Sequence, residues 1–236
     1  MRIIADLHTH TIASGHAFST IRENVSAAKR QGLSCIAITD HYPISIDKTY
    51  NYLKNLHLLP DYIDGIRLLK GIEANIIDFD GNIDVPKSIL EKLDIVIASF
   101  HSCTIPGTIE QHTNAYRNLA VNPRVHIIGH SGSEKYKYDY EEIIPLFRDH
   151  GKLIEINENT FLKRPKSVKN CMVIADLCEK HNAPIVVNSD AHSEFSVGIV
   201  EKSIAILKEI NFPEALIINA SEERLENFFY KTGVGS

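Results

Sequence analysis

The chain has 236 residues, 44% of them hydrophobic, with a formal net charge of -5 and a pI near 6.2. This length is enough for one large domain with a substantial core. The acidic balance excludes a broad attraction to nucleic acid or to an anionic membrane, so an anionic ligand must be attracted locally.

The first residues, "MRIIADLH", lack the basic start, apolar stretch and cleavage site of a signal peptide. No segment approaches the roughly 20 apolar residues that span a bilayer. The four cysteines form no CxxC pair and are too sparse for a disulfide framework. We therefore expect a cytoplasmic protein without a membrane partner.

Short β-branched runs alternate with segments of helical period along the whole chain. Thr20 and Glu23 have the spacing of a capping box, and Gly32 ends the helix that they start. Asp139 and Glu142 repeat this spacing. The predicted strands are "RIIAD" (2–6), "SCIAITD" (34–40), "RLLKGIE" (67–73), "DIVIAS" (94–99), "RVHIIG" (124–129), "KLIEIN" (152–157), "PIVVNSD" (184–190) and, more weakly, "ALIIN" (215–219). This alternation predicts parallel strands with helical crossovers.

Nothing in the sequence marks a domain boundary, so we expect a single domain over residues 1–236. Residues 50–64 are interpreted as a helical insert with a loop. Seven or eight strand-helix units fit a closed barrel, although periodicity alone also allows an open doubly wound sheet.

Histidines and carboxylates follow the ends of these strands, and this pattern favours the barrel. In a parallel barrel all strand C-termini open on one face, where active sites form. The residues at these ends are His8 and His10 after the first strand, Asp40 and His41 after the second, Glu73, His101 and His130 after the next three, and Asp190 and His192 after the seventh.

Their spacing is typical of metal ligands. His8 and His10 are two residues apart, as are Asp190 and His192, so in extended chain each pair projects to one side. Neutral imidazole binds zinc, manganese or iron, and a carboxylate can bridge two ions. Nine candidate ligands at about three per ion predict up to three metal ions. The candidates are His8, His10, His16, His41, Glu73, His101, His130, Asp190 and His192.

Several nearby residues have a structural interpretation. We expect Asp40 to orient a neighbouring imidazole or to be structural, because it points away from the side that His41 takes. The segment "GHSG" (129–132) lacks the spacing of a serine nucleophile elbow. Cys171 and Cys178 are seven apart on a predicted helix, which is core spacing. The other histidines are expected in helices, at helix ends or at the start of a strand: His57, His112, His126, His150 and His181.

Six segments together resemble the PHP (polymerase and histidinol phosphatase) family, and they are most similar to its YcdX-type phosphatase branch. They are "DLHTHTIASGHAFST", "AITDHY", "GIEANI", "SFHS", "IGHSG" and "NSDAHS". The resemblance runs from Ile3 to about Phe229. It departs from the family pattern at Ser131, where proline is expected in close relatives.

The resemblance implies a distorted TIM-like (β/α)7 barrel, with a trinuclear zinc site at the C-terminal face of the parallel strands. One ion would take His8, His10, Glu73 and Asp190; a second would take Glu73, His101 and His130; the third would take His16, His41 and His192. Glu73, Asp190 and His192 are the candidate catalytic residues. The resemblance also implies that "ALIIN" is only a short run before a final helix. Three residues of that helix, Leu225, Phe228 and Phe229, would pack inward.

The expected reaction is hydrolysis of a small phosphate monoester by a metal-activated hydroxide. Three divalent ions and two carboxylates leave a net charge of about +4, which favours a phosphate dianion. The expected partner is a small phosphorylated metabolite; nucleic acid is disfavoured, and a homo-oligomer is compatible with the sequence. The alternative metals are manganese and iron. The alternative functions are a phosphodiesterase or exonuclease, an amidohydrolase-like deacylase and a non-enzymatic barrel.

Two basic stretches, "EKYK" (134–137) and "FLKRPK" (161–166), are expected in loops on the same face. Lys137, Lys163, Arg164 and Lys166 are candidates for guiding an anionic leaving group or a second phosphate. A solvated loop is the plainer interpretation.

Overall fold

The computed structural model describes residues 1–42 and 48–234. Within them, seven parallel strands pair in the order β1-β2-β4-β5-β6-β7-β8, and the short β3 pairs antiparallel with β4. The strands are β1 (Ala5–Thr9), β2 (Cys35–Ile38), β3 (Tyr62–Ile63), β4 (Ile66–Asn75), β5 (Ile95–Ser99), β6 (Ile127–Ile128), β7 (Leu153–Asn157) and β8 (Ile185–Asn188). The predicted parallel strands are confirmed.

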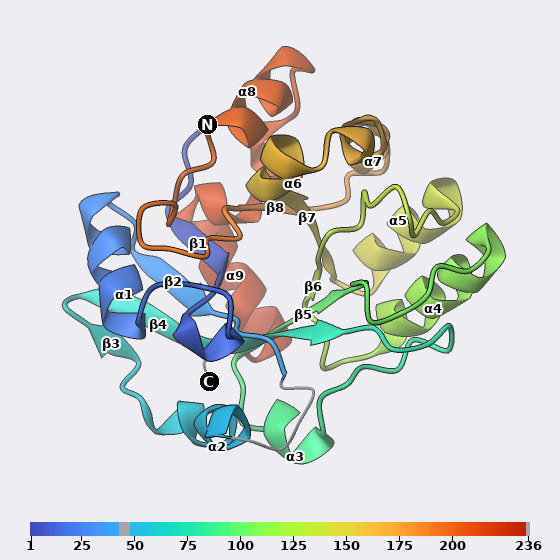
Figure 1. Ribbon diagram of the computed structural model, residues 1–236. Helices are drawn as coiled ribbons and strands as arrows, with labels where there is room; N and C mark the ends of the chain where they lie inside the picture. Colours follow the sequence, from blue (N-terminus) through green and yellow to red (C-terminus); the bar gives the residue numbers. More distant parts are fainter. Residues whose placement is uncertain (43–47, 235–236) are drawn as a thin grey trace.

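Helices cross between successive strands and surround them (Figure 1). They are α1 (Ile21–Arg30), α2 (Lys48–Asn55), α3 (Lys87–Leu90), α4 (Ile109–Val121), α5 (Tyr140–Asp149), α6 (Glu158–Lys163), α7 (Val168–His181), α8 (Glu201–Glu209) and α9 (Glu222–Thr232). No helix in the described part of the chain is long and apolar enough to cross a membrane.

The sheet closes almost completely where β8 returns to β1. Instead of a regular ladder, side chains span this seam: the amide of Asn219 donates to the carbonyls of Ala5 (2.8 Å) and Val187 (2.6 Å). The oxygen of the Asn188 side chain accepts from the Leu7 backbone N–H at 3.0 Å. The result is the distorted TIM-like barrel expected from the sequence.

The barrel interior is apolar below the strand ends. Ala5 and Leu7 of β1 belong to a buried cluster that also receives Leu225, Phe228 and Phe229 from α9. These helical residues therefore pack inward as predicted, and α9 (red in Figure 1) lies near the middle of the strands. The "ALIIN" segment forms two 3-10 turns before α9 and not an eighth barrel strand.

Local signals in the sequence act as predicted in most places. Thr20 and Glu23 form both hydrogen bonds of a capping box at the start of α1, and Gly32 follows that helix with a φ of +70°. Asp139 caps α5 through the N–H of Glu142. The first strand begins at Ala5, later than expected, because the backbone N–H of Ile4 bonds instead to the Asn219 carbonyl.

The insert over residues 50–64 contains α2 except for its first two residues, a 3-10 turn and β3. The sequence did not predict β3, which is only two residues long and pairs with the start of β4. Hydrophobic periodicity cannot mark so short a strand.

Candidate metal centre

All nine candidate ligands lie together at the C-terminal ends of the strands. Their burial differs: His8 and His10 are fully buried, whereas His16 is exposed at the outer edge of the cluster. Residues as distant in sequence as His8 and Asp190 come within 3.6 Å (Nε2 to Oδ1). The barrel topology is what produces this convergence.

A β-bulge in β1 turns the first two histidines inward. Asp6 pairs with Ile36 and Thr9 with Ile38, so three steps along β1 match two along β2. The extra residue changes the alternation of the strand. As a result His8 and His10 continue on the interior side where Leu7 already packs.

The carboxylate of Glu73 lies between two groups of imidazoles. Its Oε2 is 3.1 Å from His8 Nε2 and 3.4 Å from His10 Nε2. Its Oε1 is 3.3 Å from both His101 Nε2 and His130 Nε2. Each oxygen thus faces a different set of nitrogens, so the two oxygens would be able to hold two different ions.

Asp190 lies beside three of the same imidazoles, those of His8, His10 and His130. Its Oδ1 is 3.3 Å from His10 Nε2, and its Oδ2 is 3.6 Å from His130 Nε2. Burial alone would raise the pKa of both Asp190 and Glu73, but the neighbouring histidines, His8 above all, hold both pKa values below their ordinary range. Both groups are therefore ionised acceptors at neutral pH.

Three further histidines form the outer part of the centre. His192 Nε2 lies 2.8 Å from His16 Nε2. The rings of His16 and His41 are stacked with centroids 5.3 Å apart, and the nitrogens of His10, His41 and His192 lie within 4.8 Å of one another. His41 Nδ1 lies 3.5 Å from Glu73 Oε2, and burial lowers the pKa of this ring to about 3.

Most of these rings are held by the nitrogen that faces away from the centre. The acceptors for Nδ1 are Glu155 Oε1 for His8 (2.6 Å), Ser14 Oγ for His10 (3.0 Å), the Ser14 carbonyl for His16 (3.0 Å), Asn75 Oδ1 for His101 (2.7 Å) and the Asp190 carbonyl for His192 (2.9 Å). In a neutral ring, the form that binds a metal ion, a proton held on Nδ1 leaves the Nε2 lone pair free, which is how proteins orient histidine ligands.

Glu155 was not identified from the sequence. It lies in the middle of β7 and is fully buried, where it accepts hydrogen bonds from His8 and from the amides of Asn157 and Asn188. Burial opposes its ionisation, but the adjacent His8 holds its pKa below the ordinary value. The signal was present: "KLIEIN" has an acidic residue inside an otherwise apolar strand.

Asp40 does not point at the cluster. Its carboxylate accepts from Thr11, from the Ser14 hydroxyl at 2.6 Å and from the Tyr52 hydroxyl at 2.9 Å. Since Ser14 Oγ also contacts His10 Nδ1, Asp40 reaches that imidazole through one intervening hydroxyl. This geometry matches an orienting role. The imidazole that Asp40 orients is that of His10 and not that of the adjacent His41.

Two members of the cluster have left-handed backbone conformations. His130 has a φ of +50° and Asp190 a φ of +55°, values that cost free energy for residues other than glycine. The His130 N–H is held by Glu155 Oε2 at 3.2 Å, and the Asp190 carbonyl accepts from the Asn159 amide at 2.5 Å. These bonds stabilise the turns that aim both side chains inward.

The arrangement fits divalent metal ions. Ligands at about 2.0–2.1 Å from a tetrahedral zinc ion lie about 3.3 Å from one another, and His8 Nε2 is 3.1 Å from both His10 Nε2 and Glu73 Oε2. Within the described residues, the buried Glu73 Oε1 has no hydrogen-bond donor. Groups with metal-ligand spacing are His8, His10 and Asp190; His8, Glu73 and His130; and His10, His41 and His192.

The remaining histidines lie away from this centre. His126, at the start of β6, accepts the Val96 N–H on Nδ1. His112 is buried on α4, where it donates to the Lys137 carbonyl and accepts from the Gly107 N–H. His57 lies in a 3-10 turn, His150 follows α5 and His181 ends α7.

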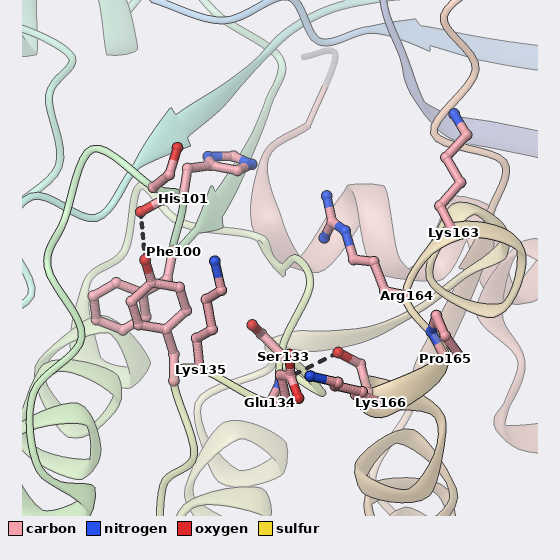
Figure 2. Close-up of a pocket in the computed structure, with 12 residues that line it drawn as sticks. Phe100, His101, Ser133, Glu134, Lys135, Lys163, Arg164, Pro165 and Lys166 are labelled. Atoms are coloured by element: carbon pink, nitrogen blue, oxygen red, sulfur yellow. Dashed lines mark hydrogen bonds between the residues drawn. The ribbon is translucent and has the colours of Figure 1, made fainter.

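A pocket of about 460 Å³ adjoins the centre at His101. The two basic stretches form its sides, and Lys163, Arg164 and Lys166 all line it (Figure 2). Residues 134–137 lie in a loop as expected, but the loop expected over 161–166 was wrong, because Lys163 ends α6 and Lys166 lies in a 3-10 turn (Pro165–Ser167). Lys137 does not line the pocket: Tyr136 is buried and the chain alternates, so Lys135 faces the pocket and Lys137 faces solvent. For Lys137 the structure therefore favours the plainer interpretation, a solvated side chain.

Comparison with known proteins agrees with this geometry. The PHP domain family model matches residues 6–159. A probable phosphatase from Acetivibrio thermocellus is 41% identical over 230 residues, covering 97% of this chain and 95% of the relative. Another, from Caldanaerobacter subterraneus subsp. tengcongensis, is 45% identical over 232 residues, covering 97% and 91%.

The fold is also similar to a solved histidinol phosphate phosphatase from Lactococcus lactis, which was crystallised with zinc, L-histidinol and phosphate. The TM-score is 0.64 at 19% identity, covering 90% of this chain and 95% of that one. At this identity the likeness concerns the fold. The family match and the two relatives carry the assignment: the chain belongs to the PHP domain family and is a hydrolase of that family.

Proposed function

We propose that the protein is a metal-dependent phosphatase that hydrolyses a small phosphate monoester at a centre of up to three ions, with zinc as the preferred metal. The residues that would hold the ions are the nine candidate ligands, grouped around Glu73. We further propose that residues 1–236 work as a single domain.

The observation that carries this proposal is the double orientation of Glu73. One carboxylate oxygen lies against His8 and His10, and the other lies against His101 and His130. A lone salt bridge would not need four imidazoles around one buried carboxylate. Two or more cations in contact with it account for all four neighbours.

Bound divalent ions would supply an activated water and polarise the phosphoryl oxygens. The chain's own contribution is to hold the ligands in place. Glu155 fixes the Nδ1 proton of His8, and Ser14 fixes that of His10, so the Nε2 atoms keep their lone pairs directed inward. Glu73 and Asp190 stay ionised and lower the positive charge of the loaded site, leaving it attractive to a phosphate dianion.

The test is hydrolysis of p-nitrophenyl phosphate and of bis(p-nitrophenyl) phosphate by the zinc-loaded protein, with Glu73→Gln as the variant. We expect cleavage of the monoester and a loss of at least about 100-fold in the variant, because its bridging charge is gone. Lys169→Gln, an exposed change on α7, is the control and should retain full activity.

Preferential cleavage of the diester would favour a phosphodiesterase and contradict the proposal. Failure of the loaded protein to cleave either ester would contradict it as well, and would direct attention to acyl substrates.

A further inference from the structure

The pocket beside His101 carries an unusual concentration of positive charge. Its lining includes Lys135, Lys163, Arg164 and Lys166, against the single carboxylate of Glu134. The chain as a whole has a net charge of -5. The pocket is thus positively charged although the protein as a whole is negatively charged, and it attracts anions locally.

None of these four cations is neutralised within the described part of the chain. Ion pairs occupy other cations, such as Arg117 with Glu142 and Lys180 with Glu141, but none includes the four pocket side chains. Lys135 extends from the loop after β6 and Arg164 from the junction after α6, and both point toward the space beside the His101 ring (Figure 2). Their donors are therefore available to a ligand.

A hydrogen bond joins the two segments that carry these cations. The backbone N–H of Glu134 donates to Oγ of the buried Ser167 at 3.2 Å, which ties the loop at Lys135 to the 3-10 turn that contains Lys166. Tyr136 is buried, stacks on Phe100 with ring centroids 4.8 Å apart, and contacts the His101 carbonyl through its hydroxyl at 2.7 Å. The backbone that carries Lys135 is thereby anchored to the same loop as a candidate metal ligand.

The pocket also has a definite size and place. A volume of about 460 Å³ suits a small molecule. His101 belongs both to this pocket and to the centre, where its Nε2 lies 3.3 Å from Glu73 Oε1. A ligand with one phosphate at the centre can therefore place its remaining part in the pocket.

We propose that this pocket binds a second anionic group of the substrate, so that the preferred substrates are small phosphate monoesters bearing another phosphate or a carboxylate. Lys135 and Arg164 are the specificity-determining residues, since they face each other across the space beside His101. This inference rests on the proposed phosphatase function and adds the class of substrate to it.

The test compares pairs of substrates that differ by one anionic group. Glycerol 3-phosphate and 3-phosphoglycerate differ by a carboxylate, and fructose 6-phosphate and fructose 1,6-bisphosphate differ by a phosphate. The zinc-loaded wild type, Lys135→Gln, Arg164→Gln and the double variant are assayed for kcat and KM, with p-nitrophenyl phosphate as a reference. Lys137→Gln is the matched control, because this lysine lies in the same loop and faces solvent.

We expect the wild type to prefer the more anionic member of at least one pair, about tenfold in kcat/KM. In the double variant this preference should fall about five- to tenfold, mainly through KM, since one charge-assisted contact has about this effect at a partly exposed site. Hydrolysis of p-nitrophenyl phosphate should stay within about twofold, and Lys137→Gln should behave as the wild type.

An equal loss on both members of each pair would overturn the inference, because the cations would then act on the scissile phosphoryl group itself. A wild type that does not distinguish the members of either pair would overturn it as well. In both cases cleavage of p-nitrophenyl phosphate leaves the phosphatase function standing. A wild type that cleaves no monoester would instead contradict the proposed function, and the inference with it.

Discussion

Replacing Glu155 with glutamine tests whether the residue behind the ligands orients them. Four donors surround its carboxylate: His8 Nδ1, the amides of Asn157 and Asn188, and the backbone N–H of His130. A carboxylate accepts from all four, whereas a glutamine amide has one accepting oxygen and one donating nitrogen. In either orientation the amide nitrogen faces donors.

The neighbours cannot adjust without further losses. The side-chain oxygen of Asn157 already accepts from the Thr160 N–H, and that of Asn188 accepts from the Leu7 N–H. Each buried donor left unsatisfied costs about 1–3 kcal/mol. Glu155→Gln should therefore lower the free energy of unfolding by about 2–4 kcal/mol and weaken zinc binding by about 10- to 100-fold, the range for residues that orient metal ligands.

Zinc affinity is measured by competition with a chelator, and stability by urea unfolding of the metal-free protein. The control is Glu158→Gln, since this buried carboxylate also accepts three hydrogen bonds but from Lys202 and Ser203. It should lose stability and keep its zinc affinity. Wild-type zinc affinity and activity in Glu155→Gln would refute the assigned role.

Three further changes test other parts of the structure. His16→Ala should lower the zinc bound per chain by about one ion and reduce kcat at least tenfold, measured by metal analysis and monoester hydrolysis; unchanged zinc content would exclude His16 as a ligand. Phe229→Ala, in the cluster that closes the barrel interior, should lower the free energy of unfolding by about 3–5 kcal/mol, and a change below 1 kcal/mol would show that α9 does not close the core. Burial lowers the pKa of His126 to about 4, from an ordinary value near 6.5, so the neutral ring stabilises the fold above pH 6.5 and about 3 kcal/mol is lost as the pH falls toward 4. In His126→Asn, which keeps an acceptor for the Val96 N–H, urea unfolding of the metal-free protein should depend less on pH over this range, and an identical pH dependence would contradict this.

The strand ends and most helix boundaries follow from local patterns. β-branched runs located the strands because both faces of a parallel barrel strand are buried. The polar residues at the C-terminal ends of these strands were then expected to lie together on one face of the barrel. Thr20 and Glu23 marked the start of α1 because capping depends only on residues within one turn.

What the sequence missed depends on packing between distant segments. The bulge between Asp6 and Thr9 arises from the pairing of β1 with β2 and leaves no mark in either strand alone. Asn219 closes the seam between β1 and β8 from a segment that resembled a further strand. Likewise, Lys135 rather than Lys137 faces the pocket because Tyr136 is buried against Phe100.

The most direct measurement is a zinc titration of the metal-free protein with p-nitrophenyl phosphate hydrolysis followed in parallel, for the wild type and for Glu73→Gln. The metal-free protein should be inactive, and activity should rise only after more than one equivalent of zinc has bound, while Glu73→Gln binds fewer ions and stays inactive. Full activity of the metal-free protein, or a fully loaded wild type that cleaves no phosphate monoester, would contradict the account.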